Sequence, residues 1–474
     1  MGPPSRLCID SFFSTSLDFK FGPSFAIKRP GNASTIRPQH DAPIGLFVRP
    51  FIIPSTANFY ARQKTCKQTH ISEYNMTDDP AFSGLRVVDF SQGIAGPHCG
   101  MLLAQHGAEV IKVEPLGGDW CRELGKRYGD QSANSVIYNR GKHSIALDLK
   151  NPEGLEIAKS LCASADVIVE NYRPGVMARF GLDEKSIRPG NPTVIYYSVT
   201  GFGQEGPNAK LPATDSVVQA YSGLMSVNLD HRGVPQRIGI LAIDISTGLY
   251  GFQAVSAALY RRAMKGVGAH IESSLMEAVG AFQSAKMVEY VKEGDEITSP
   301  GVPVGTFKAK DGFINVNARR DPHFAALCGL IGREEMATDP RYATVPARGE
   351  HEAELMDLMR ETMTGRTVAE WNKALNDVGV LNAPVHDYGD YLNDPHVKAI
   401  DAVAWVDHSG IGEIPMPNTP GLPPAKTGDP LSHSPHLGEH SAKILRDMGF
   451  SDDKITALND AGAVLTMQQK TAAE

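Results

Sequence analysis

The chain lacks any uninterrupted apolar run long enough to cross a membrane, because glycine, serine or a charged residue breaks every hydrophobic stretch. A membrane-spanning helix needs about 18 such residues, so no membrane partner is expected. Cysteine is also scarce, and the chain has no CxxC pair and no histidine spaced for zinc. This pattern predicts free thiols in a reducing compartment and no structural metal. The cysteines are Cys8, Cys66, Cys99, Cys121, Cys162 and Cys328.

Basic residues are fewer than acidic ones, and the net charge is −8. A surface of this sign argues against nucleic acid as a partner. A few local arginines or lysines could still hold an anionic cofactor, so the net charge excludes little about small ligands.

Residues 1–75 differ in composition from the rest of the chain. They hold nine lysines and arginines against four aspartates and glutamates, without helical or strand periodicity. Such a basic leader is typical of an organelle transit peptide. The alternative, which we favour, is that Met76 is the true start and the upstream stretch is a mis-called translation. On either interpretation residues 1–78 are expected to be disordered. The predicted location is the cytoplasm, or the mitochondrial matrix if the leader is genuine.

From Leu85 onward, short apolar strands alternate with helices, which is typical of a mainly parallel sheet covered by helices. We therefore predict an α/β fold. Ligands of such sheets bind beyond the carboxyl ends of the strands, so the informative loops follow Phe90, Glu114, Glu170, Val199 and Ile243. The expected strands are 85–90, 108–114, 144–149, 166–170 and 193–199, and the expected helices include 97–106 and 152–163.

The sequence changes character after about Met287. Strands at 305–308 and 313–317 flank an Asp311-Gly312 turn, which predicts a hairpin, and polar helices follow. The stretch 410–431, rich in proline and glycine, is typical of an extended connection before a final helix at 441–448. We predict a large domain over 79–287, a linker over 288–300, a smaller α+β domain over 301–392, and a return segment over 393–474.

The segment from Gly201 to Gly206 matches the GxGxxG pattern of dinucleotide-binding proteins. That pattern works only where a helix begins inside it and presents its first amides to the pyrophosphate. Pro207 and the polar run that follows it forbid a helix there. A nicotinamide enzyme is therefore not indicated.

Asp244 follows an expected strand at 239–243 and precedes an amphipathic helix that is expected to begin near Ser246. The simplest interpretation is an N-cap, since a carboxylate accepts the free amides of a first helical turn. The alternative is a nucleophile, because the positive potential of a helix end favours the ionised carboxylate. Even an upward pKa shift of about two units from burial leaves such a group mostly ionised at neutral pH.

The loop from Asn171 to Gly175 combines an amide, an aromatic ring and a guanidinium directly after the strand at 166–170. These groups are suited to adenine and phosphate recognition by stacking and charge-assisted hydrogen bonds. An ordinary solvated turn explains the same residues equally well. Arg179, further along, is of a type found more often on a helix surface than at a ligand.

The chain resembles the family III CoA transferases, the group of formyl-CoA and carnitine CoA-transferases that also includes 2-methylacyl-CoA racemases. The similarity runs from about Leu85 to Val464. It is carried by Val88-Asp89-Phe90, Ala95-Gly96-Pro97, Val110 to Glu114, Asn139-Arg140-Gly141-Lys142, Ile145 to Asp148, Glu170 to Gly175, Ser198 to Gly203, and Pro435 to His440.

The resemblance implies roles for particular residues. Asp244 matches the catalytic aspartate; Asn171, Tyr172 and Arg179 match residues that line the CoA site; and Leu147 matches a position near the adenosine end. The implied fold is an interlocked homodimer. Each chain has a large Rossmann-like domain, built from both ends of the sequence, and a small domain between them. No cofactor beyond CoA as substrate, and no metal, is implied.

The implied reaction transfers CoA from an acyl-CoA, such as a succinyl-type donor, to a small carboxylic acid. Asp244 attacks the thioester to give a mixed anhydride, and CoA thiolate then attacks the aspartyl carbonyl to give an aspartyl-CoA thioester. Backbone amides near Asp244 are expected to stabilise the oxyanions. Two alternatives remain open, a racemase of 2-methylacyl-CoA and a non-catalytic acyl-CoA-binding protein.

Three departures distinguish this chain within the family. The racemases carry a histidine where this chain has Thr214, directly before Asp215, and a hydroxyl cannot abstract a proton near neutral pH as an imidazole does. Racemisation is therefore the weaker interpretation. Some transferases have a polar glutamine where this chain has Ile94, and a glycine-repeat loop roughly where this chain has 303–307.

Overall fold

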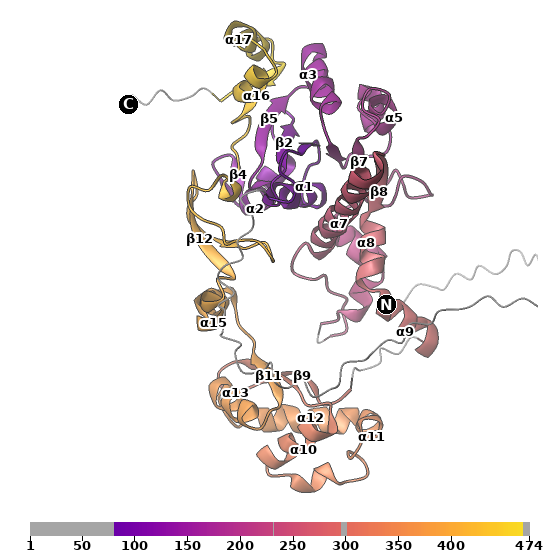
Figure 1. Ribbon diagram of the computed structural model, residues 1–474. Helices are drawn as coiled ribbons and strands as arrows, with labels where there is room; N and C mark the ends of the chain where they lie inside the picture. The colour runs from indigo at the N-terminus through magenta and orange to yellow at the C-terminus, as the bar shows by residue number, and fades with distance from the viewer. Residues whose placement is uncertain (1–79, 231, 295–300, 468–474) are drawn as a thin grey trace, which may run out of the picture. The chain divides into compact units, whose positions relative to one another are not determined.

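The computed structural model describes residues 80–230, 232–294 and 301–467. The leader over 1–78 and part of the linker over 288–300 lie outside the described residues. Within them the protein has the predicted mixed α/β fold, with a large sheet of mainly parallel strands and helices (Figure 1). No helix in the described ranges combines the length and the apolar character that a membrane crossing requires.

The large sheet has seven strands in the order β14-β5-β2-β1-β6-β7-β8. They are β1 (Arg86–Asp89), β2 (Glu109–Glu114), β5 (His143–Leu147), β6 (Val167–Glu170), β7 (Ile195–Thr200), β8 (Ala269–Ser274) and β14 (Val464–Leu465). All neighbours are parallel except β14, which runs antiparallel to β5 and pairs Val464 with Leu147. The five predicted strands are present to within two residues at each end, and β8 and β14 are additional.

Helices bury apolar side chains on both faces of this sheet. The helices of this part of the chain, not all of which lie against the sheet, are α1 (Ala95–Gln105), α2 (Ala133–Asn139), α3 (Pro152–Ala163), α4 (Val176–Phe180), α5 (Glu184–Ile187), α6 (Asp215–Tyr221), α7 (Ala242–Lys265), α8 (Leu275–Phe282), α9 (Ser284–Glu293), α16 (Ser441–Asp447) and α17 (Asp452–Asp460). Val88 packs in a core with α3, α16 and α17, while Val87 packs in a second core with α1 and α7. Successive side chains of a strand point to opposite faces, which places these neighbours in different cores.

A second, three-stranded sheet follows in the order β11-β10-β9. Its strands and helices are β9 (Val304–Lys308), β10 (Phe313–Asn317), β11 (Leu381–Pro384), α10 (Asp321–Leu330), α11 (Val345–Glu350), α12 (Glu352–Met363) and α13 (Val368–Asp377). The expected hairpin is β9-β10, in which Phe313 pairs with Lys308. Trp371 and Leu375 of α13 are buried against this sheet with Phe307 and Ile314, so the segment has its own core.

The return segment has more regular structure than its composition indicates. Helix α14 (Tyr388–Asn393) ends where the predicted return segment, 393–474, begins. That segment then contains α15 (Pro395–Ala399) and the antiparallel pair β12 (Val403–His408) and β13 (Gly412–Pro417). The extended connection expected over 410–431 is therefore wrong for its first part, where cross-strand pairing with β12 organises the backbone. Arg140 donates to the carbonyl of Pro417, which ties this hairpin to the end of α2.

Candidate active site

A pocket of about 390 Å³ lies beyond the carboxyl ends of β1, β6 and β7, where ligands of parallel sheets are expected. Its wall includes three of the sequence-predicted residues, Asp244, Asn171 and Tyr172. The remaining lining residues are Gln92, Ile94, Ala95, Trp120, Arg173, Pro174, Val199, Thr200, Gly201, Ala209, Leu211, Pro212, Ala213, Thr214 and Leu275. One pocket therefore unites segments from distant parts of the sequence.

Asp244 lies in the first turn of α7, which begins at Ala242. Residues 239–241 are bends and coil, so the expected strand at 239–243 and helix start near Ser246 are wrong. The cause is a capping group elsewhere in the sequence. Oδ2 of buried Asp215 accepts the backbone N–H groups of Ile243, at 2.7 Å, and of Asp244, at 3.1 Å. Asp215 therefore satisfies amides of this helix end, and the N-cap interpretation of Asp244 is also wrong.

Burial, together with the negative charge of Asp215, raises the pKa of Asp244 to about 7. The first amides of α7 stabilise the carboxylate of Asp215 and leave Asp244 without that compensation. The increase is larger than the two units considered from the sequence. Near neutral pH Asp244 therefore holds its proton far more readily than an ordinary aspartate.

Asn171 joins the loop after β6 to the loop after β1. Its Oδ1 accepts the backbone N–H of Gln92 at 2.8 Å, and its Nδ2 donates to the carbonyl of Gln92 at 2.6 Å. The side chain of Gln92 donates to the hydroxyl of Tyr172 at 3.0 Å. Both polar atoms of the Asn171 side chain bond to the backbone of Gln92. Asn171 therefore shapes the pocket wall by holding Gln92 in place.

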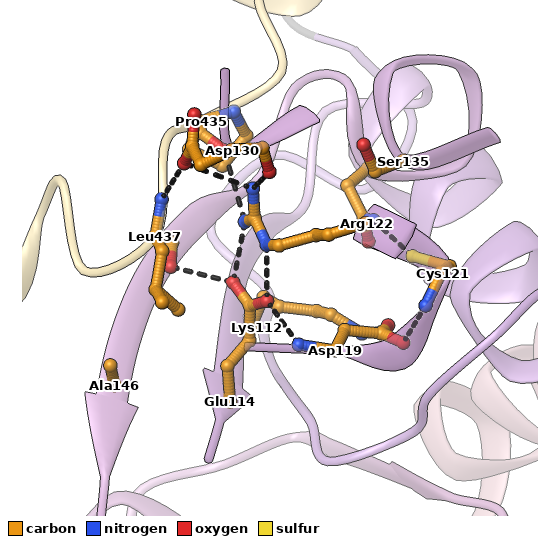
Figure 2. A network of polar contacts seen from close by, with 12 residues as sticks. Lys112, Glu114, Asp119, Cys121, Arg122, Asp130, Ser135, Ala146, Pro435 and Leu437 are labelled. Atoms are coloured by element: carbon orange, nitrogen blue, oxygen red, sulfur yellow. Dashed lines mark hydrogen bonds and ion pairs between the residues drawn. The ribbon is translucent and has the colours of Figure 1, made fainter. Parts of the chain in front are cut away.

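A buried network of ion pairs supports this wall from the side of β2 (Figure 2). Nζ of Lys112 lies 2.7 Å from Oδ2 of Asp119, and both side chains are buried. Arg122 donates two hydrogen bonds of 2.7 Å to Glu114 and a third, of 3.1 Å, to the carbonyl of Pro435. The network thus connects the loop after β2 with the return segment.

Two of the predicted CoA-site residues lie outside the pocket wall. Arg179 is an exposed residue of α4, and the side chain of Leu147 is 1% exposed in the core beneath α3. Their roles in CoA binding stay predictions. The sequence analysis did not single out Gln92 and Trp120. Their position in loops that follow strand ends, where ligands are expected, was the signal that could have identified them.

The segment from Gly201 to Gly206 contains no helix, and the next helix is α6, which begins at Asp215. The prediction that no helix begins in this segment is confirmed. Among the residues that the structure describes, no group of three histidine, cysteine, aspartate or glutamate side chains is placed to hold a metal ion. The described cysteines, Cys99, Cys121, Cys162 and Cys328, are buried free thiols, while Cys8 and Cys66 lie outside the described residues.

A family model for CoA-transferase family III matches residues 82–441, which include the whole pocket wall. The chain belongs to this family. As a family III CoA transferase, it is an enzyme that transfers CoA between an acyl-CoA and a carboxylic acid.

Similar proteins extend over most of this CoA transferase. The succinate–glutarate CoA-transferase of Agrobacterium fabrum is 34% identical over 391 residues, which cover 78% of this chain and 96% of that protein. The human succinyl-CoA:glutarate CoA-transferase is 33% identical, with 82% of this chain and 91% of that protein covered. The crystal structure of a CAIB/BAIF family protein from Brucella suis superposes with a TM-score of 0.69 at 33% identity, and covers 78% of this chain and 100% of that one.

Proposed function

We propose that this CoA transferase works by covalent catalysis, with Asp244 as the nucleophile. The observation that carries the proposal is the place of Asp244 on the wall of the pocket, which it shares with Asn171 and Tyr172. Asp244 is a half-buried carboxyl, and no hydrogen bond to its side chain is found in the part of the chain that the structure describes. A carboxylate without protein partners is available to a substrate carbonyl.

The proposed reaction has four steps. A carboxylate oxygen of Asp244 attacks the thioester carbonyl of the donor, CoA thiolate leaves, and a mixed anhydride forms. The thiolate then attacks the aspartyl carbonyl, which releases the donor acid and leaves an aspartyl-CoA thioester. The acceptor carboxylate attacks this thioester and again expels thiolate, giving a second anhydride. Attack of the thiolate on the acceptor carbonyl forms the new acyl-CoA and regenerates Asp244.

The partial burial of Asp244 favours this reaction in two ways. It keeps water from the anhydrides, which hydrolyse readily. It also makes the carboxylate more basic, as its raised pKa records, and a more basic carboxylate is a stronger nucleophile once ionised. Ile243 and Asp244 direct their amides to Asp215, so the oxyanions in this proposal are stabilised by other groups of the pocket wall, such as the hydroxyl of Thr214.

The proposed substrates are a succinyl-type acyl-CoA as donor and a small carboxylic acid as acceptor. Support comes from the similarity to enzymes named for succinate, succinyl-CoA and glutarate. We further propose that the enzyme acts as an interlocked homodimer. Large apolar side chains exposed on α7 to α9 support self-association, among them Tyr260, Met264, Phe282, Val288 and Val291. The cytoplasm, or the mitochondrial matrix if the leader is genuine, is the proposed compartment.

A 2-methylacyl-CoA racemase is a poorer match to this pocket. None of the residues that line it carries an imidazole, and Thr214 occupies the position where racemases have their histidine. Incubation of the full chain with 2-methylacyl-CoA in heavy water, without an acceptor acid, distinguishes the two reactions. We expect no deuterium at the 2-position; uptake would establish the racemase instead.

The proposal is tested by trapping the intermediate on the full-length protein. The enzyme is incubated with a panel of acyl-CoA donors and quenched with hydroxylamine, which converts an activated aspartyl group to a stable hydroxamate. Peptide mass spectrometry should find the hydroxamate at Asp244, and the Asp244→Asn variant should remain unmodified. If transfer proceeds with a competent donor while Asp244 stays unmodified, covalent catalysis at this residue is excluded. An Asp244→Ala variant that keeps full transfer would likewise exclude it, whereas one that binds CoA without turnover contradicts a purely binding role.

A further inference from the structure

Trp120 presents a large aromatic surface to the pocket that contains Asp244. It belongs to the short 3₁₀ helix η2 (Trp120–Glu123), lines the pocket wall, and is 51% exposed. Ligand sites in proteins are concave and lined mainly by apolar and aromatic side chains. An indole that is exposed in a pocket is therefore placed to contact a ligand.

The backbone that carries Trp120 is held by buried charges. Oδ1 of Asp119 accepts the N–H of Cys121 at 2.9 Å and the N–H of Gly93 at 2.8 Å. Oδ2 of the same carboxylate accepts from Lys112, as Figure 2 shows for the buried pair. The N–H of Asp119 in turn donates to Glu114 at 3.0 Å. Such a network fixes where the indole lies, so Trp120 is a preorganised part of the wall.

Gly93 leaves the space in which the indole packs. A Cβ atom added to Gly93 would lie 2.0 Å from Cζ2 of Trp120, far inside van der Waals contact. The two residues come from the loops after β1 and β2, so the glycine lets the indole lie directly against the backbone of the neighbouring loop. Any side chain at this position would have to displace the ring.

Part of the pocket wall is apolar. Ile94, Leu211, Val199 and Leu275 line the same pocket. Its volume of about 390 Å³ is near the lower end of the range for small-molecule sites, so the bulk of one indole decides how much room a bound chain has. A substrate with a hydrocarbon segment gains from burial against this wall, whereas the shortest acids have no carbon chain to bury.

We propose that Trp120 is a specificity-determining residue of this enzyme, and that it selects carboxylic acids whose hydrocarbon segment is long enough to pack on its indole. The inference rests on the proposed function. The substrate class is therefore acids with several methylene groups, in preference to acids such as oxalate. Removing the indole takes away the apolar surface on which such a chain packs, and so weakens the preference for longer acids over oxalate.

The test compares acceptor preference across straight-chain dicarboxylic acids from oxalate to adipate, with one acyl-CoA donor at fixed concentration. For Trp120→Ala we expect the ratio of kcat/KM for adipate to kcat/KM for oxalate to fall by about tenfold, since one methylene in an apolar pocket is worth about 10-fold to 200-fold in discrimination. The same ratio for Trp120→Phe should lie between those of Trp120→Ala and the wild type. Trp405→Ala is the matched control, because Trp405 lies on β12 outside this pocket and is equally exposed, at 50%.

A second variant displaces the ring without altering it. Gly93→Ala should change the same ratio by severalfold, because the added methyl group pushes the indole from its place. Gly84→Ala controls for backbone strain: Gly84 has a φ of 78°, close to the 80° of Gly93, but nothing lies within 4 Å of its added Cβ. Thermal unfolding of each variant confirms that it is folded.

The outcomes separate this inference from the proposed function. If the wild type transfers CoA and is modified at Asp244, but all acceptors lose activity by the same factor in Trp120→Ala and Gly93→Ala, Trp120 is only structural and the inference is overturned. If the wild type prefers oxalate over every longer acid, the proposed substrate class is wrong. If the wild type transfers CoA to no acid, the proposed function fails first and the inference fails with it.

Discussion

Oδ2 of Asp215 accepts a 3.1 Å hydrogen bond from the backbone N–H of Asp244, so one carboxylate caps the helix that carries the other. Asp215 is 1% exposed and is held by Gln219, whose amide lies 2.5 Å from Oδ1. The pair gives the two carboxyl groups different environments. Asp215 has donors around it, while Asp244 is half-buried without them; this loss of hydration, with the negative charge of Asp215, raises the pKa of Asp244 to about 7.

Transfer activity should depend on pH through Asp244. Only the ionised carboxylate attacks the thioester, and its pKa is raised to about 7, so kcat/KM should rise with pH up to that value and level off above it. Below the pKa the loss is about tenfold per pH unit. The measurement is kcat/KM across a pH range in buffers of constant ionic strength. A profile that stays flat through this region would contradict ionisation of Asp244 as the controlling step.

The Asp244→Asn variant should become more stable than the wild type as pH rises. This is the reverse of the effect expected when a carboxyl with a lowered pKa is removed. Asp244 binds protons more tightly in the folded state, because its pKa is raised from 3.8 to about 7. Its contribution to stability is therefore complete below the unfolded value and is lost as pH rises through the folded value. Asparagine removes this loss, so the variant should be more stable than the wild type by roughly 1–3 kcal/mol near pH 8.

Urea unfolding at the two ends of this pH window provides the measurement. The difference between the variant and the wild type should vanish as pH falls below about 3, where Asp244 is protonated in both states. The same preparation should transfer CoA at least about a thousandfold more slowly, because its nucleophile is gone. A variant that is stabilised equally at both pH values would point to a packing effect rather than to ionisation.

Variants of Asp215 should distinguish its role as hydrogen-bond acceptor at the start of α7 from the effect of its negative charge on the pKa of Asp244. In Asp215→Ala, loss of the acceptor leaves the amides of Ile243 and Asp244 unpaired, which should cost about 1–3 kcal/mol of unfolding free energy. Loss of the negative charge should at the same time lower the pKa of Asp244 and move the acid limb of the pH–rate profile to lower pH. In Asp215→Asn the amides keep an acceptor while the charge is removed, so the shift of the profile should persist with less loss of stability. A profile that is unmoved in both variants would refute the electrostatic coupling of the pair.

Asn171→Ala should disconnect the loops after β1 and β6. Both backbone groups of Gln92 lose their partner, which should lower the unfolding free energy by about 1–3 kcal/mol and weaken acyl-CoA binding. Asn171→Asp is the matched control, because aspartate can still accept from the N–H of Gln92 but cannot donate to its carbonyl. Calorimetric titration with CoA and thermal unfolding give the two readouts. Equal binding by all three proteins would show that this connection does not shape the site.

Lys142→Met should be strongly destabilising. Nζ of Lys142 lies 2.8 Å from Oδ2 of Asp89, and both side chains are completely buried. Burial alone would raise the pKa of Asp89, but the ammonium groups of Lys142 and Lys112 hold it below the ordinary value. Removing Lys142 leaves this carboxylate poorly compensated, at a cost of about 3–5 kcal/mol.

The loss in Lys142→Met should shrink as pH falls, because Asp89 can then accept a proton and lose its charge. The additional change Asp89→Asn should recover part of the loss at neutral pH. Lys443→Met is the control, since its pair with Asp447 is exposed and such pairs contribute about 0–1 kcal/mol. Chemical unfolding at two pH values tests all three proteins. A cost for Lys142→Met no larger than for the control would mean that the buried pair is not needed for stability.

Much of the fold follows from local pattern. The apolar runs that end at Asp89, Glu114 and Glu170 are each bounded by turn residues, and all of them are strands of the parallel sheet. β14 has two residues and no pattern of its own, because it is a strand only through pairing with β5. Proline and glycine in this part of the sequence are not typical of strands, so β12 and β13 were not predicted. Their pairing with each other forms them despite that composition.

The sequence by itself determined that the chain forms an α/β fold with ligand-binding loops after its strands, and it singled out Asp244, Asn171 and Tyr172. These features depend on residue type and on spacing along the chain. Only the tertiary structure decided that Asp215 caps α7, that Asn171 serves the backbone of Gln92, and that Trp120 lies on the pocket wall against Gly93. Each of these contacts joins residues at least twenty-seven positions apart, and no local pattern encodes which distant partner a polar or aromatic side chain will meet.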